Sequence, residues 1–380
     1  RTYGVILFQD QVNQLAIGVA GFTPLEADQL RRAYGRKNNE TLLLNYWEKF
    51  KHASGLRGVP EKAAHRIFSK LNGLYMFPES HAFAFGVTAY QASWLKHYYP
   101  AEFYCGLFNE QPMGFYSPET LKEDAKRHGV DMLLPDVNLS YERCVLEGDS
   151  IRLGFRYVDR LGSAKIKSIT SARDRNGPFW SIRNFMERTR LEKNVLENLV
   201  DAGAFDSLQR ERRSIRWEIG LRYRATNQQL ALPLPVEQDN VQLQRLTPWE
   251  IMEGEYRTIS LHPNSHVMAY IRPHLPNRVL SSEAAKVLPE GTKVTICGLV
   301  IRRQRPLAKA VFITLEDEFG HIPLTVWPKT YRKYRLQLRE RFVMAQGTIS
   351  RTDGTFSIVV NSAHGMSHIV ASVPKSKNWA

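Results

Sequence analysis

The chain has 380 residues, of which 43% are hydrophobic and 11% aromatic, so it can bury the cores of two to three domains and is not wholly disordered. Lys and Arg number 52 against 38 Asp and Glu, and the formal net charge of +14 points to a polyanionic partner, either nucleic acid or an anionic membrane surface. No apolar run approaches the roughly 20 residues of a membrane span. The first residues lack an initiator Met and a signal-peptide cleavage site, so we expect a piece of a longer protein.

The first 130 residues are predicted to be helical. Apolar residues recur with a helical period over residues 5–19, and Gly21 ends that segment. Ser117 has the context of a helix cap, because Pro and Glu follow it, and Gly129 follows basic residues at a helix end. Other helices are expected over residues 24–34, 41–53, 60–71 and 81–98.

The next segments are mixed. Residues 144–154 read as a small β-hairpin with Gly148 in its turn, and residues 156–208 as helices in short pieces. Residues 209–245 begin as an Arg-rich helix and continue as a polar, proline-containing linker. A bridging segment, residues 246–290, follows.

Residues 291–370 alternate apolar and polar side chains, with glycines at the turns. Five runs have strand character, VTICGLVI, VFITLED, IPLTVW, FVMAQGTI and FSIVV, and a helix is expected between the third and the fourth. This is the order of elements in an oligonucleotide/oligosaccharide-binding (OB) barrel. The predicted fold class is therefore multidomain: mainly α, followed by an all-β five-stranded OB barrel.

No disulfide framework and no metal site are expected. Cys105, Cys144 and Cys297 lie far apart, without a CxxC spacing, and fit a reducing, cytoplasmic environment. His262 and His266 are four residues apart, but the proline between them disfavours a continuous helix.

Two segments of the helical region carry anion-binding chemistry. Residues 30–37 read LRRAYGRK. Their cations form either a solvated surface that complements the helix dipole or a phosphate-binding site. The guanidiniums of Arg31 and Arg32 have the geometry to bind a phosphate. The second segment, FPESHAFAF, opens a long helix with Ser80 as its N-cap and His81 in its first turn. A phosphate contact and a capping role beside the core are both consistent with this pair. Hydrolytic catalysis is not expected, because no acidic residue is placed to orient the imidazole.

Tyr90, Trp94 and Tyr98 recur every four residues along the same helix. Such a stripe is more often part of a core than a platform for stacking bases. We therefore expect these three rings to be buried.

Residues 157–170 predict a helix, a turn with Gly162, and a second helix. A glycine turn that feeds a helix N-terminus aims backbone N–H groups at a phosphate, as in a helix-hairpin-helix, which grips a duplex backbone without reading its sequence. A second candidate over residues 191–208 indicates a tandem pair. The expected DNA contacts are Gly162, Ser163, Lys165 and Lys167.

The barrel region places cations beside aromatic residues. A single strand needs both, since bases stack on the rings and the backbone is neutralised by the cations. In the alternative interpretation, Trp327 belongs to the barrel core and the charges are solvated. The acidic run at residues 316–318 resembles a turn rather than a metal pair. The candidate contacts are Arg302, Arg303, Trp327, Arg332, Lys333 and Arg335.

Several long stretches resemble the fingers of the bacterial C-family polymerases, the DNA polymerase III alpha subunits. They are SHAFAFGVTAYQASWLKHYYPAEF, LRRAYGRK and NEQPMGFYSPETLKEDAKRHGVDMLLPDVN. FPESHA, QPMGFYSP and VWPKTYRKYRLQLRER are closer to the error-prone, damage-induced branch than to the main replicase. The resemblance extends to about residue 365.

The resemblance implies a domain layout and two further sites. Residues 1–130 would be part of the fingers, 131–208 the end of the fingers with the tandem helix-hairpin-helix, 209–245 a basic helix and linker, 246–290 the bridge and 291–370 the OB domain. The residues placed around the triphosphate of an incoming deoxynucleotide would be Arg31, Arg32, Lys37, Ser80 and His81. The second site is a hexapeptide similar to those that dock on sliding clamps, with Gln229, Leu230, Leu232 and Leu234 as its contact residues. The same pattern arises easily by chance in a Leu-rich linker. An accessory polymerase-like protein could contact the clamp instead.

The aspartates that hold the two catalytic metal ions of this family lie in a palm that precedes the fingers. The present sequence has no Asp-x-Asp strand motif. We therefore expect the nucleotide- and DNA-binding portion of an error-prone DNA-directed DNA polymerase, a nucleotidyltransferase of replication and translesion repair. The chain would bind no cofactor itself and be inactive alone, while its parent uses Mg²⁺.

Two alternatives remain at this point. The first is a freestanding DNA-binding adaptor with helix-hairpin-helix and OB modules and no polymerase role. The second is an RNA-binding OB protein, which a preference for RNA over DNA would reveal.

Overall fold

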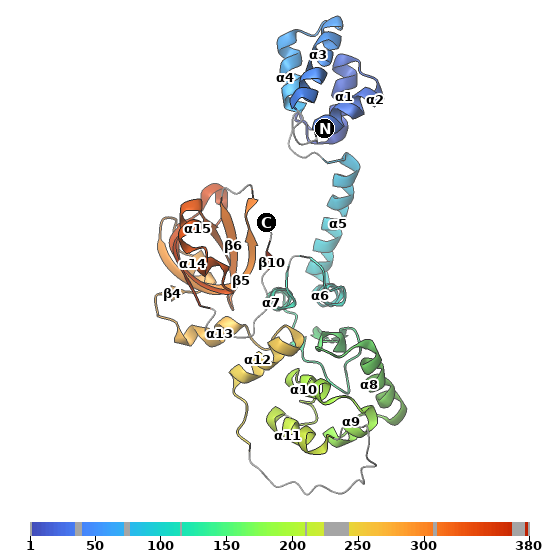
Figure 1. Ribbon diagram of the computed structural model, residues 1–380, viewed down its shortest axis with the longest axis vertical. Helices are drawn as coiled ribbons and strands as arrows, with labels where there is room; N and C mark the ends of the chain where they lie inside the picture. Colours follow the sequence, from blue (N-terminus) through green and yellow to red (C-terminus); the bar gives the residue numbers. More distant parts are fainter. Residues whose placement is uncertain are drawn as a thin grey trace. The chain divides into compact units, whose positions relative to one another are not determined.

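The computed structural model describes residues 2–34, 40–71, 77–114, 116–209, 211–223, 243–306, 310–366 and 377–378. The chain divides into two compact units, residues 1–97 and 98–380 (Figure 1). Each unit buries its own hydrophobic side chains. The division falls inside the segment predicted as fingers, and the predicted domain boundaries stay predictions. Among the described residues, no helix is long and apolar enough to cross a membrane.

The first unit consists of short helices around one core, followed by a long helix. Leu30 and Phe50 are fully buried in that core. The first helix begins later than the periodicity predicts, because Phe8 is extended and pairs with Phe77 in an isolated β-bridge. The helices are α1 (Gln9–Ala20), α2 (Pro24–Tyr34), α3 (Glu40–Leu56), α4 (Glu61–Leu71) and α5 (Glu79–Tyr98).

The second unit opens with helices and a small sheet around a core in which Phe155, Phe185 and Phe205 are fully buried. Two predicted helix ends are confirmed: the Ser117 hydroxyl caps α7, and Gly129 adopts a left-handed φ of 77° after it. The elements are α6 (Pro100–Asn109), α7 (Pro118–Arg127), β1 (Met132–Leu133), β2 (Val145–Glu147), β3 (Ser150–Arg152), η1 (Phe155–Tyr157), α8 (Ser163–Asn176), α9 (Ile182–Thr189), α10 (Lys193–Asp201) and α11 (Arg212–Arg222).

The described part of the bridging segment is folded. The Thr247 hydroxyl accepts a hydrogen bond from the Glu250 N–H, and the Glu250 carboxylate accepts one from the Thr247 N–H, a capping box that starts α12. Its elements are α12 (Pro248–Ile259), α13 (Val267–Ile271), η2 (Arg272–His274), β4 (Val279–Leu280) and α14 (Ser282–Lys286).

The barrel closes as predicted. β5 pairs with both β6 and β8, β7 with β6 and β9, and β8 with β9, so the five strands form a ring with the topology of an OB fold (Figure 1). The helix α15 lies between the third and fourth strands. The elements are β5 (Lys293–Gln304), β6 (Val311–Glu316), β7 (His321–Val326), α15 (Pro328–Tyr334), η4 (Gln337–Arg339), β8 (Phe342–Ser350), η5 (Thr352–Gly354) and β9 (Ser357–Gly365), and β10 (Lys377–Asn378) pairs with the end of β5.

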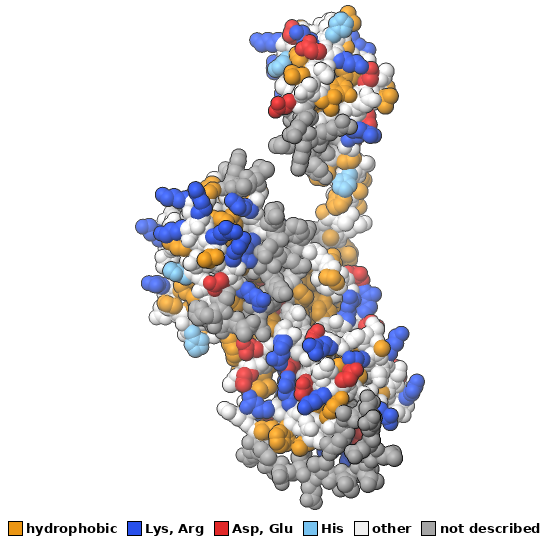
Figure 2. All heavy atoms as spheres, in the orientation of Figure 1, with side chains coloured by type: hydrophobic (Ala, Val, Ile, Leu, Met, Phe, Trp, Pro, Cys, Tyr) orange, Lys and Arg blue, Asp and Glu red, His pale blue; other side chains and the backbone are white. Residues whose placement is uncertain are grey.

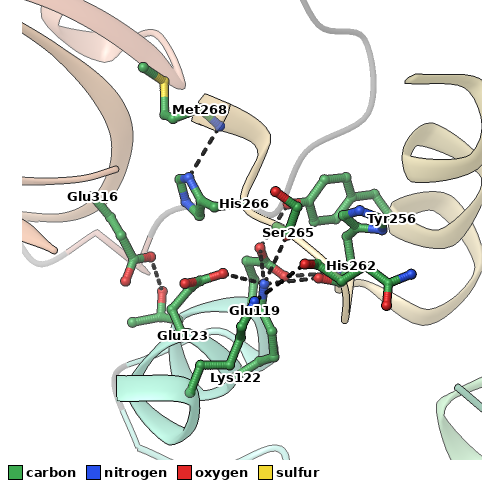
Figure 3. A network of polar contacts seen from close by, with 12 residues as sticks. Glu119, Lys122, Glu123, Tyr256, His262, Ser265, His266, Met268 and Glu316 are labelled. Atoms are coloured by element: carbon green, nitrogen blue, oxygen red, sulfur yellow. Dashed lines mark hydrogen bonds and ion pairs between the residues drawn. The ribbon is translucent and has the colours of Figure 1, made fainter. Parts of the chain in front are cut away.

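A buried lysine joins α7 to the bridging segment (Figure 3). The Lys122 ammonium donates to Glu119 (2.9 Å), to Glu123, and to the carbonyl oxygens of His262 (2.9 Å) and Ser265 (3.1 Å). Its side chain is fully buried. Burial alone would lower the pKa of Lys122, but the charges of the two carboxylates outweigh that effect and raise it, so the ammonium stays charged.

A buried glutamate joins the same helix to the barrel. Glu316, at the end of β6, is fully buried and accepts hydrogen bonds from Thr120 (3.2 Å) and Arg127 (3.0 Å), and its other contact is the His321 ring (2.8 Å). Burial by itself would raise the pKa of Glu316, but the hydrogen bond with His321 and the nearby positive charges lower it to about 2. The next residue, Asp317, accepts from the N–H groups of the following turn, in agreement with the prediction of a turn.

Replacing Lys122 by Met should strongly destabilise the second unit. The substitution leaves the carboxylates of Glu119 and Glu123 buried without their shared cation, which costs about 3–5 kcal/mol. Urea denaturation measures the loss. In the control Lys126→Met, which removes a surface contact with the Asn264 carbonyl, the free energy of unfolding should fall by less than about 1 kcal/mol; equal losses would contradict the role of Lys122.

Glu316 should make the free energy of unfolding depend on pH in the acidic range. The pKa of this carboxyl is about 2 in the folded protein and 4.5 when unperturbed. Its ionised form therefore stabilises the folded state fully above pH 4.5, and this contribution is lost as the pH falls toward 2. The difference in unfolding free energy between the wild type and Glu316→Gln should therefore shrink by up to about 3 kcal/mol across that window. Exposed Glu283→Gln controls for the lost charge, and a difference independent of pH would refute the assignment.

Candidate nucleic-acid interface

The predicted nucleotide-binding arginines lie at the end of α2. Arg31 is partly buried and donates to Asp28 (2.6 and 2.9 Å) and to Gln9 (3.0 Å). Arg32 is 68% exposed and forms an ion pair with the other oxygen of the same carboxylate (2.7 Å). The hydrogen bond from Arg31 lowers the pKa of Asp28. One carboxylate thus holds both guanidiniums at the surface, while Lys37 lies outside the described residues.

Ser80 and His81 lie in the first turn of α5 and are exposed. The prediction that Ser80 is the N-cap is wrong, because the helix begins at Glu79, whose N–H donates to the carboxylate of Asp10 (3.2 Å). The His81 ring stacks on Phe77 with centroids 5.6 Å apart. The imidazole is therefore packed between aromatic neighbours at the start of the helix.

The first turn of α1 contacts both predicted elements. Gln9 accepts from Arg31 of α2, and the adjacent Asp10 accepts from the first N–H group of α5. The backbone N–H of Gln9 also donates to the Phe77 carbonyl (2.9 Å). The arginine end of α2 and the start of α5 therefore flank one short segment of the same unit.

The rings of the aromatic stripe on α5 are exposed. Tyr90 is 72% exposed, Trp94 43% and Tyr98 60%, so the prediction of core rings is wrong here. None of the twenty residues of α5, all of which are described, is buried. The three rings are therefore part of the surface of α5 and not of a core.

The predicted hairpin turn is present before α8. Gly162 is exposed and extended (φ −71°) as the N-cap, and the backbone N–H groups of the first turn follow it. Ser163 is the first helical residue and donates to Glu142 (2.9 Å). Lys167 is exposed, whereas Lys165 is only 32% exposed and pairs with Glu192 (2.7 Å). The turn borders two surface hollows of about 730 and 660 Å³, to which Arg156 also contributes.

The outer face of β5, β6 and β7 carries an aromatic residue that the sequence analysis missed. Phe312 is 42% exposed, although it lies in a strand whose other apolar residues are buried. Its cross-strand neighbours are Gln304 and Thr325, and exposed Arg302 lies two residues before Gln304 on the same face. The alternation in VFITLE places Phe312 outward and could have revealed it.

The cations around the barrel differ in their surroundings. Arg332, Lys333 and Arg335 on and after α15 are exposed, and Trp327 is 54% exposed, so the alternative that assigned this ring to the core is wrong. Figure 2 shows Lys and Arg side chains gathered over the barrel. By contrast, Arg303 donates to the Leu338 carbonyl (2.9 Å) and to that of Glu340, and burial lowers its pKa to about 10.

The remaining sequence candidates have structural partners or lie outside the described chain. His262 contacts Glu255 (2.5 Å) and Tyr270 (3.1 Å), and His266 accepts from the Met268 N–H (3.2 Å). Both imidazoles are buried. All four residues proposed for the clamp-binding peptide, Gln229, Leu230, Leu232 and Leu234, lie outside the described residues.

Arg302 and Arg303 should differ in effect despite being neighbours. Arg302→Ala should weaken single-stranded DNA binding and reduce the slope of log affinity against log salt by about 0.7, because one exposed phosphate contact is lost. Arg303→Ala should mainly lower the unfolding temperature, because its guanidinium bonds the barrel's own carbonyls. Fluorescence anisotropy and thermal melting measure the two effects, and the reverse ranking would contradict the placement.

Comparison with known proteins gives a consistent result for three separate regions. Residues 1–55 match the bacterial DNA polymerase III alpha subunit finger domain, residues 129–215 the helix-hairpin-helix motif, and residues 294–364 the OB-fold nucleic acid binding domain. Among solved structures, an asparaginyl-tRNA synthetase from Pyrococcus horikoshii is similar over 26% of this chain and 24% of its own, with 17% identity and a TM-score of 0.22, too little to support an argument.

Curated relatives match nearly the whole chain. The error-prone DNA polymerase of Anaeromyxobacter sp. (strain K) is 37% identical over 95% of this chain and 33% of its own length, and that of Sinorhizobium medicae is 34% identical over 95% and 35%. That of Dechloromonas aromatica is 37% identical over 89% and 33%. The chain thus spans about a third of these relatives. The resemblance is confirmed: the chain belongs to the error-prone branch of the C-family DNA polymerases and comprises finger, helix-hairpin-helix and OB modules.

Proposed function

We propose that this chain is the nucleotide- and DNA-binding portion of an error-prone DNA-directed DNA polymerase that acts in replication and translesion repair synthesis in the bacterial cytoplasm. The observation that carries the proposal is the identity of 34–37% to error-prone polymerases across 95% of the chain, with all three modules in one order. The net charge of +14 supports a polyanionic partner.

The two DNA-binding modules would contact different parts of a primed template. The Gly162 turn leads into the N-terminus of α8 and has cations nearby, which suits the phosphates of a duplex. The barrel offers Phe312 and Trp327 beside Arg302 and the cations of α15, which suits the stacked bases of a single strand.

The first unit would hold the triphosphate of the incoming deoxynucleotide. Arg31 and Arg32 are already oriented by Asp28, and a guanidinium suits a phosphate because its donors form a planar fork. Lys37, Ser80 and His81 would complete the site. The exposed aromatic surface of α5 would then face the nucleotide and the rest of the polymerase.

The chemistry itself would depend on groups outside these residues. Two metal-bound carboxylates are needed for nucleotidyl transfer, with Mg²⁺ as the expected ion. The acidic run of the barrel does not fit this task, since Glu316 is held by Thr120 and Arg127, and Asp317 by Ser282 and Arg272. A sliding clamp or an accessory polymerase-like protein remains a proposed partner.

Replacing Arg31 and Arg32 by Ala in the complete polymerase should separate nucleotide use from DNA binding. Loss of charged contacts to the triphosphate should raise the nucleotide KM by about tenfold or more, whereas duplex affinity should change less than about twofold. Steady-state incorporation and anisotropy on primed DNA measure the two quantities, with Arg66→Ala on α4 as an exposed control from the same unit.

The 380-residue chain alone should bind primed DNA in a salt-dependent manner and incorporate no nucleotide with Mg²⁺. Incorporation by this chain would refute the assignment of the metal-binding acids to another segment. A clear preference for RNA over DNA would remove the polymerase assignment itself.

A further inference from the structure

The two hairpins of the second unit bury equivalent positions, displaced by 30 residues. Phe155 and Phe185 are both fully buried before the turns, and Ile169 and Leu199 are both fully buried after them. Most residues at equivalent positions of the two segments differ in type, but the pattern of buried and exposed positions is similar in both. The tandem arrangement therefore allows a comparison of the two turns position by position.

The turns share an unusual backbone. Arg160 and Arg190 both adopt positive φ, 62° and 49°, which is uncommon for a residue with a side chain. A buried leucine follows each, and then an extended N-cap residue with φ of −71° in the first copy and −67° in the second. The N-cap is Gly162 in the first hairpin and Glu192 in the second.

This difference adds a negative charge to the second turn at the position equivalent to Gly162. The first turn ends on a residue without a side chain, so an anion can approach the N–H groups of α8. The second turn places a carboxylate at the start of α10. The second turn therefore lacks the open approach that the first turn offers to an anion.

The carboxylate of Glu192 also reaches the first hairpin. It accepts from the ammonium of Lys165 at 2.7 Å, and the same ammonium lies 3.4 Å from the Arg160 carbonyl in the first turn. Lys165 and Gly162 border the same surface hollow. The hydrogen bond from Lys165 lowers the pKa of Glu192, so the carboxylate is charged at neutral pH.

We propose that Glu192 competes with DNA for Lys165, so that the second hairpin limits the strength with which the first grips the duplex backbone. A phosphate seated at the Gly162 turn would draw the same ammonium that Glu192 holds. The pair is solvent-accessible, 32% and 60% exposed, so the lysine can exchange between the carboxylate and DNA. This inference rests on the proposed DNA-binding function of the hairpin.

A double-mutant cycle on the complete 380-residue chain tests the proposal with a blunt DNA duplex at several salt concentrations. Glu192→Gln should tighten binding about two- to fivefold and steepen the slope of log affinity against log salt by about 0.9, because one more phosphate is neutralised. In the Lys165→Gln background the same substitution should have no effect on either quantity. Glu187→Gln is the matched control, since Glu187 is 59% exposed and paired with Arg183 at 2.7 Å.

Three outcomes would overturn the proposal. Unchanged affinity of Glu192→Gln, a gain that persists without Lys165, or an equal gain in Glu187→Gln would show that the pair does not compete with DNA. If the wild-type chain shows no salt-dependent duplex binding, the proposed function fails and this inference falls with it. Wild-type binding without the predicted gain refutes the inference alone.

Discussion

A lysine ammonium with no access to water fixes how α7 meets the rest of the second unit. Lys122 of α7 is held by two carboxylates of its own helix and by two carbonyls of the bridging segment. Tyr256 of α12 donates to Glu119 at 2.7 Å, so the network includes a second helix. Buried charges are tolerated only in such geometry, because each loses its hydration on folding.

The same helix reaches the barrel through Thr120 and Arg127, which both donate to buried Glu316. At the two residues that follow Glu316, Arg272 of the bridge contacts Asp317 and Glu318. The OB barrel is thus joined to α7 and to the bridge by polar contacts of defined geometry. The surface proposed for single-stranded DNA and the hairpin proposed for the duplex therefore belong to the same compact unit.

Local patterns predicted much of this fold, because they depend on short-range physics. The cap at Ser117, the turn at Gly148 and the alternation of five strands are encoded in neighbouring residues, and all are present. The Lys122 network could not be predicted, since it joins residues about 140 positions apart. The ion pair of Lys165 with Glu192 could not be predicted either, because it joins two different hairpins.

The errors have equally specific causes. Helical periodicity marks an apolar face but not what covers it, so the rings on α5 were expected to be buried and are exposed. A cluster of cations indicates a basic surface but not which of them are hydrogen-bonded within the protein. Arg303 was therefore expected to contact DNA in the same way as its neighbour Arg302. The proposed nucleotide site is supported by the contacts of Gln9 and Asp10 with α2 and α5.

The central claim is that separate modules of one chain bind the duplex and single-stranded parts of a primed template. Site-specific photo-crosslinking of a primed template to this chain, followed by mass spectrometry of the labelled peptides, tests it most directly. Probes in the duplex should label residues 156–201, and probes in the template overhang should label β5 to β7 and α15. Labelling of one module by both probes, or of neither module, would contradict the account.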